Sequence, residues 1–184
     1  LKLIKSAIQR TIWRNRAEKG IILFDEFAKQ LKFDNVLESV EFYYQAIRKQ
    51  NGAIGIILQS INQLPSNSTS ASILENTQVI YSLRNEKGYD ELVKRLSLSS
   101  HDLNQLKSIK NDLKGHRKYT EIFIKIGKES NIFRLEVPPK VYAAYLTDGT
   151  ENEAIMAIYK KTKNMESAII EFVKQKFQKS NSLI

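Results

Sequence analysis

Two adjacent carboxylates follow a short apolar run near the start of the chain. The run is IILF, residues 21–24, and it leads directly into Asp25 and Glu26. Four consecutive apolar residues fit a strand that is buried on both faces, as strands of parallel sheets are. In doubly wound sheets, ligands bind beyond the carboxyl ends of the strands. The pattern therefore predicts a nucleotide-hydrolysing site with a metal ligand at Asp25 and a general base at Glu26, or alternatively two acids that only cap the next helix.

A glutamine and two basic residues are further candidates for the same site. Gln59 ends a second apolar run, AIGIILQ, and in a parallel sheet it should lie near Asp25. A neutral amide at that place can orient a water molecule or sense a γ-phosphate. Arg48 and Lys49 end the preceding helix, where the helix dipole favours basic residues whatever their function. Because that helix end faces the opposite edge of the sheet, an arginine there would more easily reach the nucleotide of a neighbouring subunit.

The elements that must position these residues alternate between helices and strands. The helix predicted after residue 35, with Asp34 or Asn35 as its cap, has apolar residues on one side and stops at Asn51-Gly52. The whole series is a helix at 1–17, a strand at 21–24, the helix after 35, a strand at 53–59, a short helix at 71–76 and a strand at 78–83. This order predicts an open parallel sheet with helical crossovers.

The second half of the chain has a different pattern. Two short helices are predicted at 87–96 and 99–109, with Ser99 as the N-cap of the second. Polar and apolar residues alternate at 118–126 and 131–137, which predicts a β-hairpin around the turn at 127–130. After Pro138-Pro139 the chain should be helical to about residue 178, with breaks near Asp148-Gly149 and Asn164.

Composition narrows the classes of protein. The chain has 184 residues, 42% of them hydrophobic, and a net charge of +9, which indicates a globular basic protein. It has no cysteine and two histidines, which excludes disulfides and thiolate metal sites. No apolar run is long enough for a membrane span, and no signal peptide is apparent. Basic residues are in excess at 1–20 and 84–128, which would suit nucleic acid, an anionic membrane surface or simply solvent.

The order of these segments resembles the conjugation ATPases of type IV secretion systems. The likeness is to the VirB-type and TraG-type families, in the HerA–FtsK branch of RecA-like P-loop motors, and it extends from about residue 5 to 160. It rests on these stretches in fixed order: IILFDE, YYQAIRKQNGAIGIILQS, ILENTQVIYSLRN, LSLSSHDLNQLKSI and YTEIFIKIGKESNIFRLEVPP. The resemblance implies an α/β fold with a parallel sheet core flanked by helices, followed by a β-hairpin and helices.

The resemblance also assigns a role to each candidate residue. All of them match positions that bind or hydrolyse the nucleotide in the family: Asp25 and Glu26 match the Walker B acids, Gln59 the sensor glutamine and Arg48 the arginine that acts in trans, with Lys49 and Arg84 as alternatives for that role. The implied cofactors are ATP and Mg2+. The implied partners are further copies in a hexamer, other type IV secretion components and DNA, at the cytoplasmic face of the inner membrane.

One essential motif of such enzymes does not occur in this sequence. A P-loop needs the spacing Gly-x-x-x-x-Gly-Lys-[Ser/Thr], and the glycines do not provide it: Gly20, Gly52, Gly55, Gly88, Gly115, Gly127 and Gly149. The chain also does not begin with Met. We therefore expect the C-terminal part of an ATPase, inactive alone, in which 1–85 holds the Walker B part of the core and 86–184 completes the domain.

Two other interpretations remain open at this point. One is a non-catalytic basic module that binds DNA or a secretion partner protein, and the other is a peripheral membrane-binding domain. The sequence does not specify whether DNA, protein or both are transported, which mobile element uses the protein, or the number of subunits in a ring.

Overall fold

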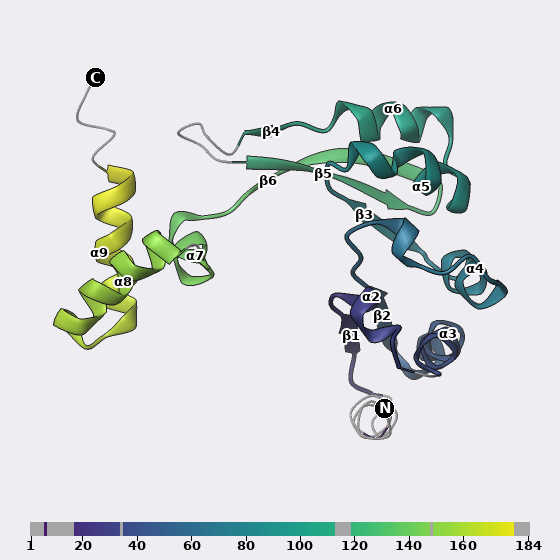
Figure 1. The fold of residues 1–184 in the computed structure, drawn as a ribbon, viewed down its shortest axis with the longest axis horizontal. Coiled ribbons are helices and arrows are strands. Elements are labelled where there is room, and N and C mark those ends of the chain that lie inside the picture. The colour runs from purple at the N-terminus through teal and green to yellow at the C-terminus, as the bar shows by residue number, and fades with distance from the viewer. Residues whose placement is uncertain (1–5, 7–16, 34, 113–118, 148, 179–184) are drawn as a thin grey trace. The chain divides into compact units, whose positions relative to one another are not determined.

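A computed structural model describes residues 6, 17–33, 35–112, 119–147 and 149–178 (Figure 1). Nearly all of the helix predicted at 1–17 lies outside these residues, as do Asp34 and His116. The chain divides into two compact units, one formed by 1–110 with 121–133 and the other by 111–120 with 134–184.

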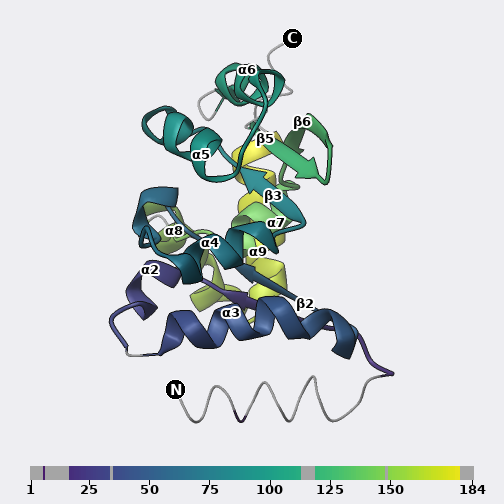
Figure 2. The same ribbon diagram turned by 90° about the vertical axis from the view of Figure 1, so that its right-hand side faces the viewer.

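Two parallel strands carry the first part of the predicted site. β1 (Gly20–Phe24) pairs with β2 (Gly52–Ile56), with Gly20 opposite Gly52 and Phe24 opposite Ile56. The connection between them contains α2 (Phe27–Gln30), α3 (Val36–Ala46) and the 3-10 turn η2 (Ile47–Gln50). α3 lies beside the two strands (Figure 2). This strand–helix–strand unit confirms the predicted parallel pairing.

The sequence pattern predicted that the apolar residues of β1 are buried on both faces of the strand. This prediction is wrong, because one of the two faces is exposed. Side chains alternate along a strand, so Ile22 and Phe24 pack into the core with α3 and α4 (Ser68–Glu75). Ile21 and Leu23 point the other way and are 73% and 65% exposed. The reason is that helices of the described residues cover only one face of this pair.

The third predicted strand belongs to another sheet. β3 (Val79–Ser82) pairs antiparallel with β5 (Tyr119–Ile126), so the predicted three-stranded parallel sheet is wrong. β5 also pairs with β4 (Asn111–Asp112) and with β6 (Glu129–Glu136). The predicted hairpin is confirmed, with a tight turn in which Gly127 has a φ of 57°. An apolar run specifies a buried strand but not its partner, which explains the error.

Short helices cover one face of this second sheet (Figure 1). They are η4 (Glu86–Gly88), α5 (Tyr89–Arg95) and α6 (Ser100–Ser108), and η3 (Ile61–Gln63) precedes them in the chain. Their apolar side chains enclose the fully buried Phe123 of β5. Ser99 is the N-cap of α6, as predicted.

The other unit contains the C-terminal helices. These are α7 (Pro139–Ala144), α8 (Gly149–Thr162), α9 (Met165–Val173) and the π-turn η5 (Lys174–Gln178). Their core contains Ala143, Ile155, Ala168 and Phe172. The predicted break at Asn164 is confirmed, since its side chain accepts a hydrogen bond from the Ser167 N–H and caps α9. None of the helices in the described ranges has the length and apolar character needed to span a membrane.

Candidate functional site

The two acids sit on a turn that is held by buried neighbours. Phe24 and Phe27 flank them and pack edge to face in the core, with ring centroids 5.9 Å apart. The Ile57 N–H donates to the Phe24 carbonyl at 2.9 Å, and the Phe27 N–H donates to the Ile57 carbonyl at 3.1 Å. Asp25 and Glu26 lie between these two bonds and are exposed. The turn is therefore fixed against the segment that follows β2, while its carboxylates face solvent.

The backbone of the second acid is strained. Glu26 has φ 47° and ψ 44°, in the left-handed region that residues other than glycine rarely adopt. Such a conformation costs on the order of 1–3 kcal/mol and is found most often at functional sites. Glu26 precedes α2, but its side chain makes no capping hydrogen bond. Helix capping thus does not explain the presence of this acid.

The carboxylates have few partners. Asp25 Oδ1 accepts a hydrogen bond from the Glu26 N–H at 2.8 Å, and Glu26 forms an ion pair with Lys29. Both members of that pair are exposed, so it contributes little to stability and can be exchanged for another partner. Magnesium in phosphoryl-transfer sites takes one or two carboxylates and completes its shell with water and phosphate oxygens. The donor set at this turn fits that requirement.

Gln59 lies at the same edge of the parallel pair as the acids. β2 ends at Ile56, three residues earlier than predicted, but Ile57 continues beside the acid turn through its two backbone hydrogen bonds. The Gln59 N–H donates to Gln63 Oε1 at 3.0 Å, and its carbonyl accepts from Asn85 Nδ2 at 3.0 Å. Its side chain is exposed and makes no hydrogen bond to any part of the chain that the structure describes. The backbone is therefore held while the amide is available.

Arg48 and Lys49 lie at the other edge. Both are exposed residues of η2, directly before the start of β2. The Gly20 N–H donates to the Asn51 carbonyl at 3.4 Å, which places η2 beside the beginning of β1. β2, which lies between these cations and Gln59 in the chain, is 5 residues long and spans roughly 17 Å at about 3.3 Å per residue. The structure does not bring them together with the acids of the same chain.

Arg84 follows β3 and lies next to a residue that contacts the site. Its guanidinium donates to the Glu86 carboxylate, and this hydrogen bond raises the pKa of Arg84. Asn85, the next residue, is the one that donates to the Gln59 carbonyl. The segment that contains Arg84 therefore reaches the edge that carries Gln59 and the acids.

Three residues that support this region were not predicted from the sequence. Asn85 and Gln63 hold the Gln59 backbone, and Arg95 donates hydrogen bonds to three carbonyls of the following loop. Ser60 and Gln63 form a capping box around η3, and the spacing Ser-x-x-Gln is a sequence signal that could have identified it. Arg95 is in the last turn of α5, where the helix dipole alone accounts for a basic residue.

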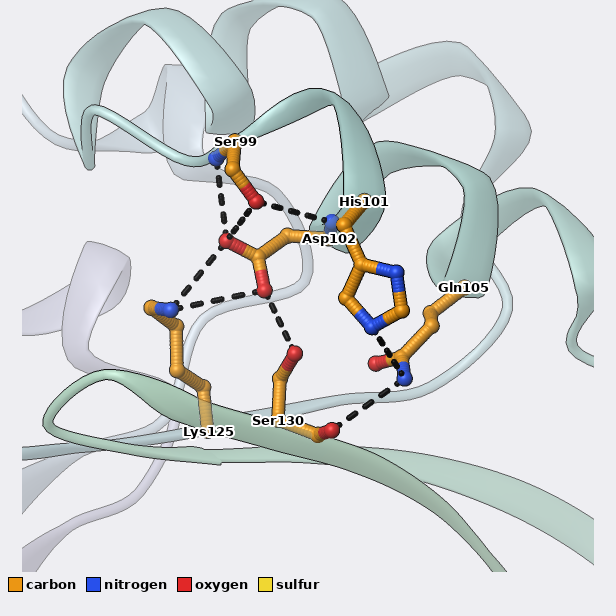
Figure 3. A network of polar contacts seen from close by, with 6 residues as sticks. All are labelled: Ser99, His101, Asp102, Gln105, Lys125 and Ser130. Atoms are coloured by element: carbon orange, nitrogen blue, oxygen red, sulfur yellow. Dashed lines mark hydrogen bonds and ion pairs between the residues drawn. The ribbon is translucent and has the colours of Figure 1, made fainter.

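A third acid, Asp102, is buried in a polar network between α6 and the β5–β6 hairpin (Figure 3). Its carboxylate accepts hydrogen bonds from the backbone and hydroxyl of Ser99, from Ser130 and from Lys125 Nζ at 3.1 Å. Burial raises the pKa of Asp102, but these donors together outweigh that effect and leave the pKa well below its usual range. The Gln105 amide extends the network to the Ser130 carbonyl. With its lone pairs occupied, Asp102 holds the hairpin against α6.

Comparison with known proteins supports the fold and the family. A search of curated proteins gave no match. Among solved structures, the chain is similar to VirB4 of Thermoanaerobacter pseudethanolicus, with 19% identity and a TM-score of 0.56 over 74% of this chain. The match covers 36% of that VirB4 chain, so the present chain spans little more than a third of its length. At this identity the likeness shows the fold, which is α/β and RecA-like as predicted.

A family model gives the relationship directly. The model of the TraG P-loop domain matches residues 3–176, nearly the whole chain. This result confirms the resemblance to conjugation and type IV secretion ATPases that the order of segments had indicated. The chain belongs to the TraG P-loop domain family.

Proposed function

We propose that this chain supplies the acid half of the ATP-hydrolysing site of a motor that powers conjugative DNA transfer or type IV secretion. The observation that carries the proposal is the hydrogen-bonded junction between the acid turn and the segment after β2. It holds Asp25, Glu26 and Gln59 at one edge of a parallel strand pair, with exposed side chains. Ligands of open α/β sheets bind at such an edge.

Each residue has a distinct task in this proposal. Asp25 holds Mg2+, which when bound neutralises charge on the phosphates of ATP. Gln59 orients a water molecule for attack on the γ-phosphorus, and Glu26 accepts the proton of that water. The bond between the γ-phosphorus and the β–γ bridging oxygen breaks, so that ADP and phosphate leave. The strained backbone of Glu26 and its exchangeable ion pair with Lys29 are consistent with this role.

The phosphate-binding loop must come from a segment that is not in this sequence. The glycine spacing of a P-loop does not occur here, and acids alone repel phosphate. We therefore propose that the chain is the C-terminal part of a longer ATPase and does not hydrolyse ATP alone. The matched share of VirB4, 36%, supports a longer protein.

The arrangement also suggests how subunits cooperate. Arg48 and Lys49 lie at the edge of the strand pair away from the acids. We propose that Arg48 reaches the nucleotide of the next subunit in a ring, with hexamers as the expected assembly, at the cytoplasmic face of the inner membrane. Lys49 and Arg84 are the alternative residues for this contact.

The experiment that tests the proposal is magnesium-dependent ATP hydrolysis by the full-length protein and its Glu26→Gln variant. The variant keeps shape and hydrogen bonding but lacks the base, so it should bind ATP while turnover falls by on the order of 10²–10⁴-fold. Gln59→Ala should lower kcat more than nucleotide affinity. Near-normal hydrolysis by Glu26→Gln would place the base elsewhere. Full-length protein that binds but never hydrolyses ATP would favour the non-catalytic module.

A further inference from the structure

The loop after β2 is held by side chains from a distant part of the sequence. This loop, residues 59–65, begins with Gln59 and contains η3. Its far end is anchored by Leu64, which is buried in the same core as Phe24 and Phe27 beside the acid turn. Between these ends, two backbone hydrogen bonds form within the loop, from the Gln63 N–H to the Ser60 carbonyl and from the Leu64 N–H to the Ile61 carbonyl, both at 3.1 Å.

Arg95 supplies side-chain donors to three carbonyls of this loop. Its Nη1 donates to the carbonyls of Ile61 at 2.9 Å and Leu64 at 2.7 Å, and its Nη2 donates to the Pro65 carbonyl at 2.9 Å. The planar guanidinium offers donors in a fixed fork, which a lysine ammonium lacks. Hydrogen bonds from a charged donor are also about twice as strong as neutral ones. Arg95 therefore fixes the second half of the loop to the end of α5.

Asn85 holds the first half at the other end of the same helical segment. Its Nδ2 donates to the Gln59 carbonyl at 3.0 Å, and its own N–H donates to the hydroxyl of the buried Tyr89 at 3.1 Å. Gly88 leaves room for this carboxamide, because a Cβ at that position would lie 3.1 Å from Asn85 Nδ2. Tyr89 thus holds the Asn85 backbone, while the Asn85 carboxamide lies close to Gly88 and donates to Gln59.

We propose that Asn85 and Arg95 are positioning residues that set the place of Gln59 relative to Asp25 and Glu26. The inference rests on the proposed function, in which Gln59 orients the attacking water. It adds that the geometry of the sensor glutamine is determined by η4 and α5, which lie next to Arg84. A displacement of this segment, by a partner or by a neighbouring nucleotide, would shift Gln59 without touching the acids.

The first part of the test measures how firmly the loop is held, by amide hydrogen exchange in this chain. Arg95→Ala should speed exchange of the Gln63 and Leu64 amides on the order of 10- to 100-fold, because three charge-assisted hydrogen bonds are lost. Arg95→Lys should give a smaller increase. The exposed neighbour Lys94 provides the control, since Lys94→Ala should leave exchange unchanged. Equal exchange in Arg95→Ala and Lys94→Ala would overturn the proposal, whatever the protein hydrolyses.

The second part measures hydrolysis in the full-length protein. Arg95→Ala and Asn85→Asp should each lower kcat about 10-fold or more while KM for ATP stays within about twofold, because water placement rather than nucleotide binding is affected. In a Gln59→Ala background the same changes should add little further loss. If the losses in kcat from Arg95→Ala or Asn85→Asp add in full to the loss from Gln59→Ala, the positioning role is overturned. If wild-type protein shows no hydrolysis, the proposed function fails while the exchange result still decides whether the loop is held in this way.

Discussion

Asp25 and Asp102 are aspartates in opposite situations. Asp102 is 2% exposed and its carboxylate accepts hydrogen bonds from Ser99, Ser130 and Lys125. Asp25 is exposed, and the hydrogen bond that reaches its side chain comes from the next backbone N–H. A carboxylate with filled lone pairs contributes to folding and has no capacity left for a ligand. A carboxylate left open contributes little to folding and can bind a cation.

The same contrast applies to the neighbours of each acid. The donors around Asp102 come from the N-cap of α6, from β5 and from β6 of one chain, so this carboxylate is satisfied without a second subunit. The open acids have Gln59 beside them, but Arg48, the residue proposed to act in trans, lies with Lys49 at the opposite edge of the strands. Completion of the open site from a second subunit is therefore the first point to test.

The largest expected effect is that of Arg48→Ala in the full-length protein. If Arg48 acts in trans, hydrolysis should fall by ~10³–10⁵-fold, with nucleotide binding and folding preserved. Mixing inactive Arg48→Ala with inactive Glu26→Gln subunits should restore activity, because some interfaces then pair an intact Arg48 with an intact Glu26. The measurement is ATP turnover against mixing ratio, after mixed assembly has been verified.

A different result would identify a local role. If Arg48 only favours the C-terminus of its helix, Arg48→Ala should cost less than about 1 kcal/mol of stability and leave turnover nearly intact. If verified mixed rings fail to regain activity, Arg48 and Glu26 act on the same nucleotide. The residue that acts in trans would then be Lys49 or Arg84.

The next effect concerns stability. Asp102→Asn should lower the free energy of unfolding by about 3 kcal/mol, because Lys125 loses its buried partner and the new amide N–H faces other donors. Asp25→Asn should change it by less than about 0.5 kcal/mol, since an exposed side chain keeps its single acceptor oxygen. Urea unfolding followed by circular dichroism compares the two. Equal losses of unfolding free energy in both variants would show that the buried, hydrogen-bonded Asp102 and the exposed Asp25 contribute alike to folding.

A smaller effect is expected in the dependence of stability on pH. The folded-state pKa of Asp102 lies below that of an unfolded aspartate, which is about 3.9. Its contribution is therefore fully present above about pH 5 and is lost as the pH falls through the folded-state pKa. Urea titrations between pH 6 and acid conditions should show a steeper loss of stability in the wild type than in Asp102→Asn. Parallel curves would contradict the buried, hydrogen-bonded carboxylate.

The smallest expected effect is a gain in stability. Glu26→Asn should raise the free energy of unfolding by about 1 kcal/mol, because asparagine tolerates the left-handed conformation that glutamate adopts here. Glu26→Gln is the matched control, since it removes the charge and the Lys29 pair but keeps the strain. The urea midpoints of the two variants separate the effect of backbone strain from the effect of the lost charge and the lost Lys29 ion pair. A loss of stability in Glu26→Asn would mean that the turn is not strained.

The sequence predicted those features that depend on local pattern. The apolar runs before Asp25 and Gln59 identified the parallel strands, Ser99 was correctly predicted as a helix N-cap, and Asn164 was correctly predicted as a break between helices. The strand at 79–82 was recognised but assigned to the wrong sheet, because its partner β5 comes some forty residues later and no local signal names it. β2 was extended to Gln59 because Ile57 and Leu58 are apolar, although the ladder ends before them.

The supporting contacts of the site could not be predicted for a different reason. Arg95 binds backbone carbonyls, which every residue has, so the loop that it holds carries no complementary residue type. Asn85 likewise contacts the carbonyl of Gln59 rather than its side chain. The Asp102 network combines a predictable cap from Ser99 with Lys125 and Ser130, which come from a hairpin far along the chain. Such contacts follow from the tertiary fold alone.

The alternation of buried and exposed residues around the acid turn has a consequence for evolution. Phe24 and Phe27 are committed to the core, whereas Asp25 and Glu26 between them are exposed. A lineage could therefore exchange either acid and lose the proposed chemistry in a single step, with little penalty in folding and an expected gain at Glu26. Variants that keep the fold but lack this chemistry should arise readily from such a scaffold.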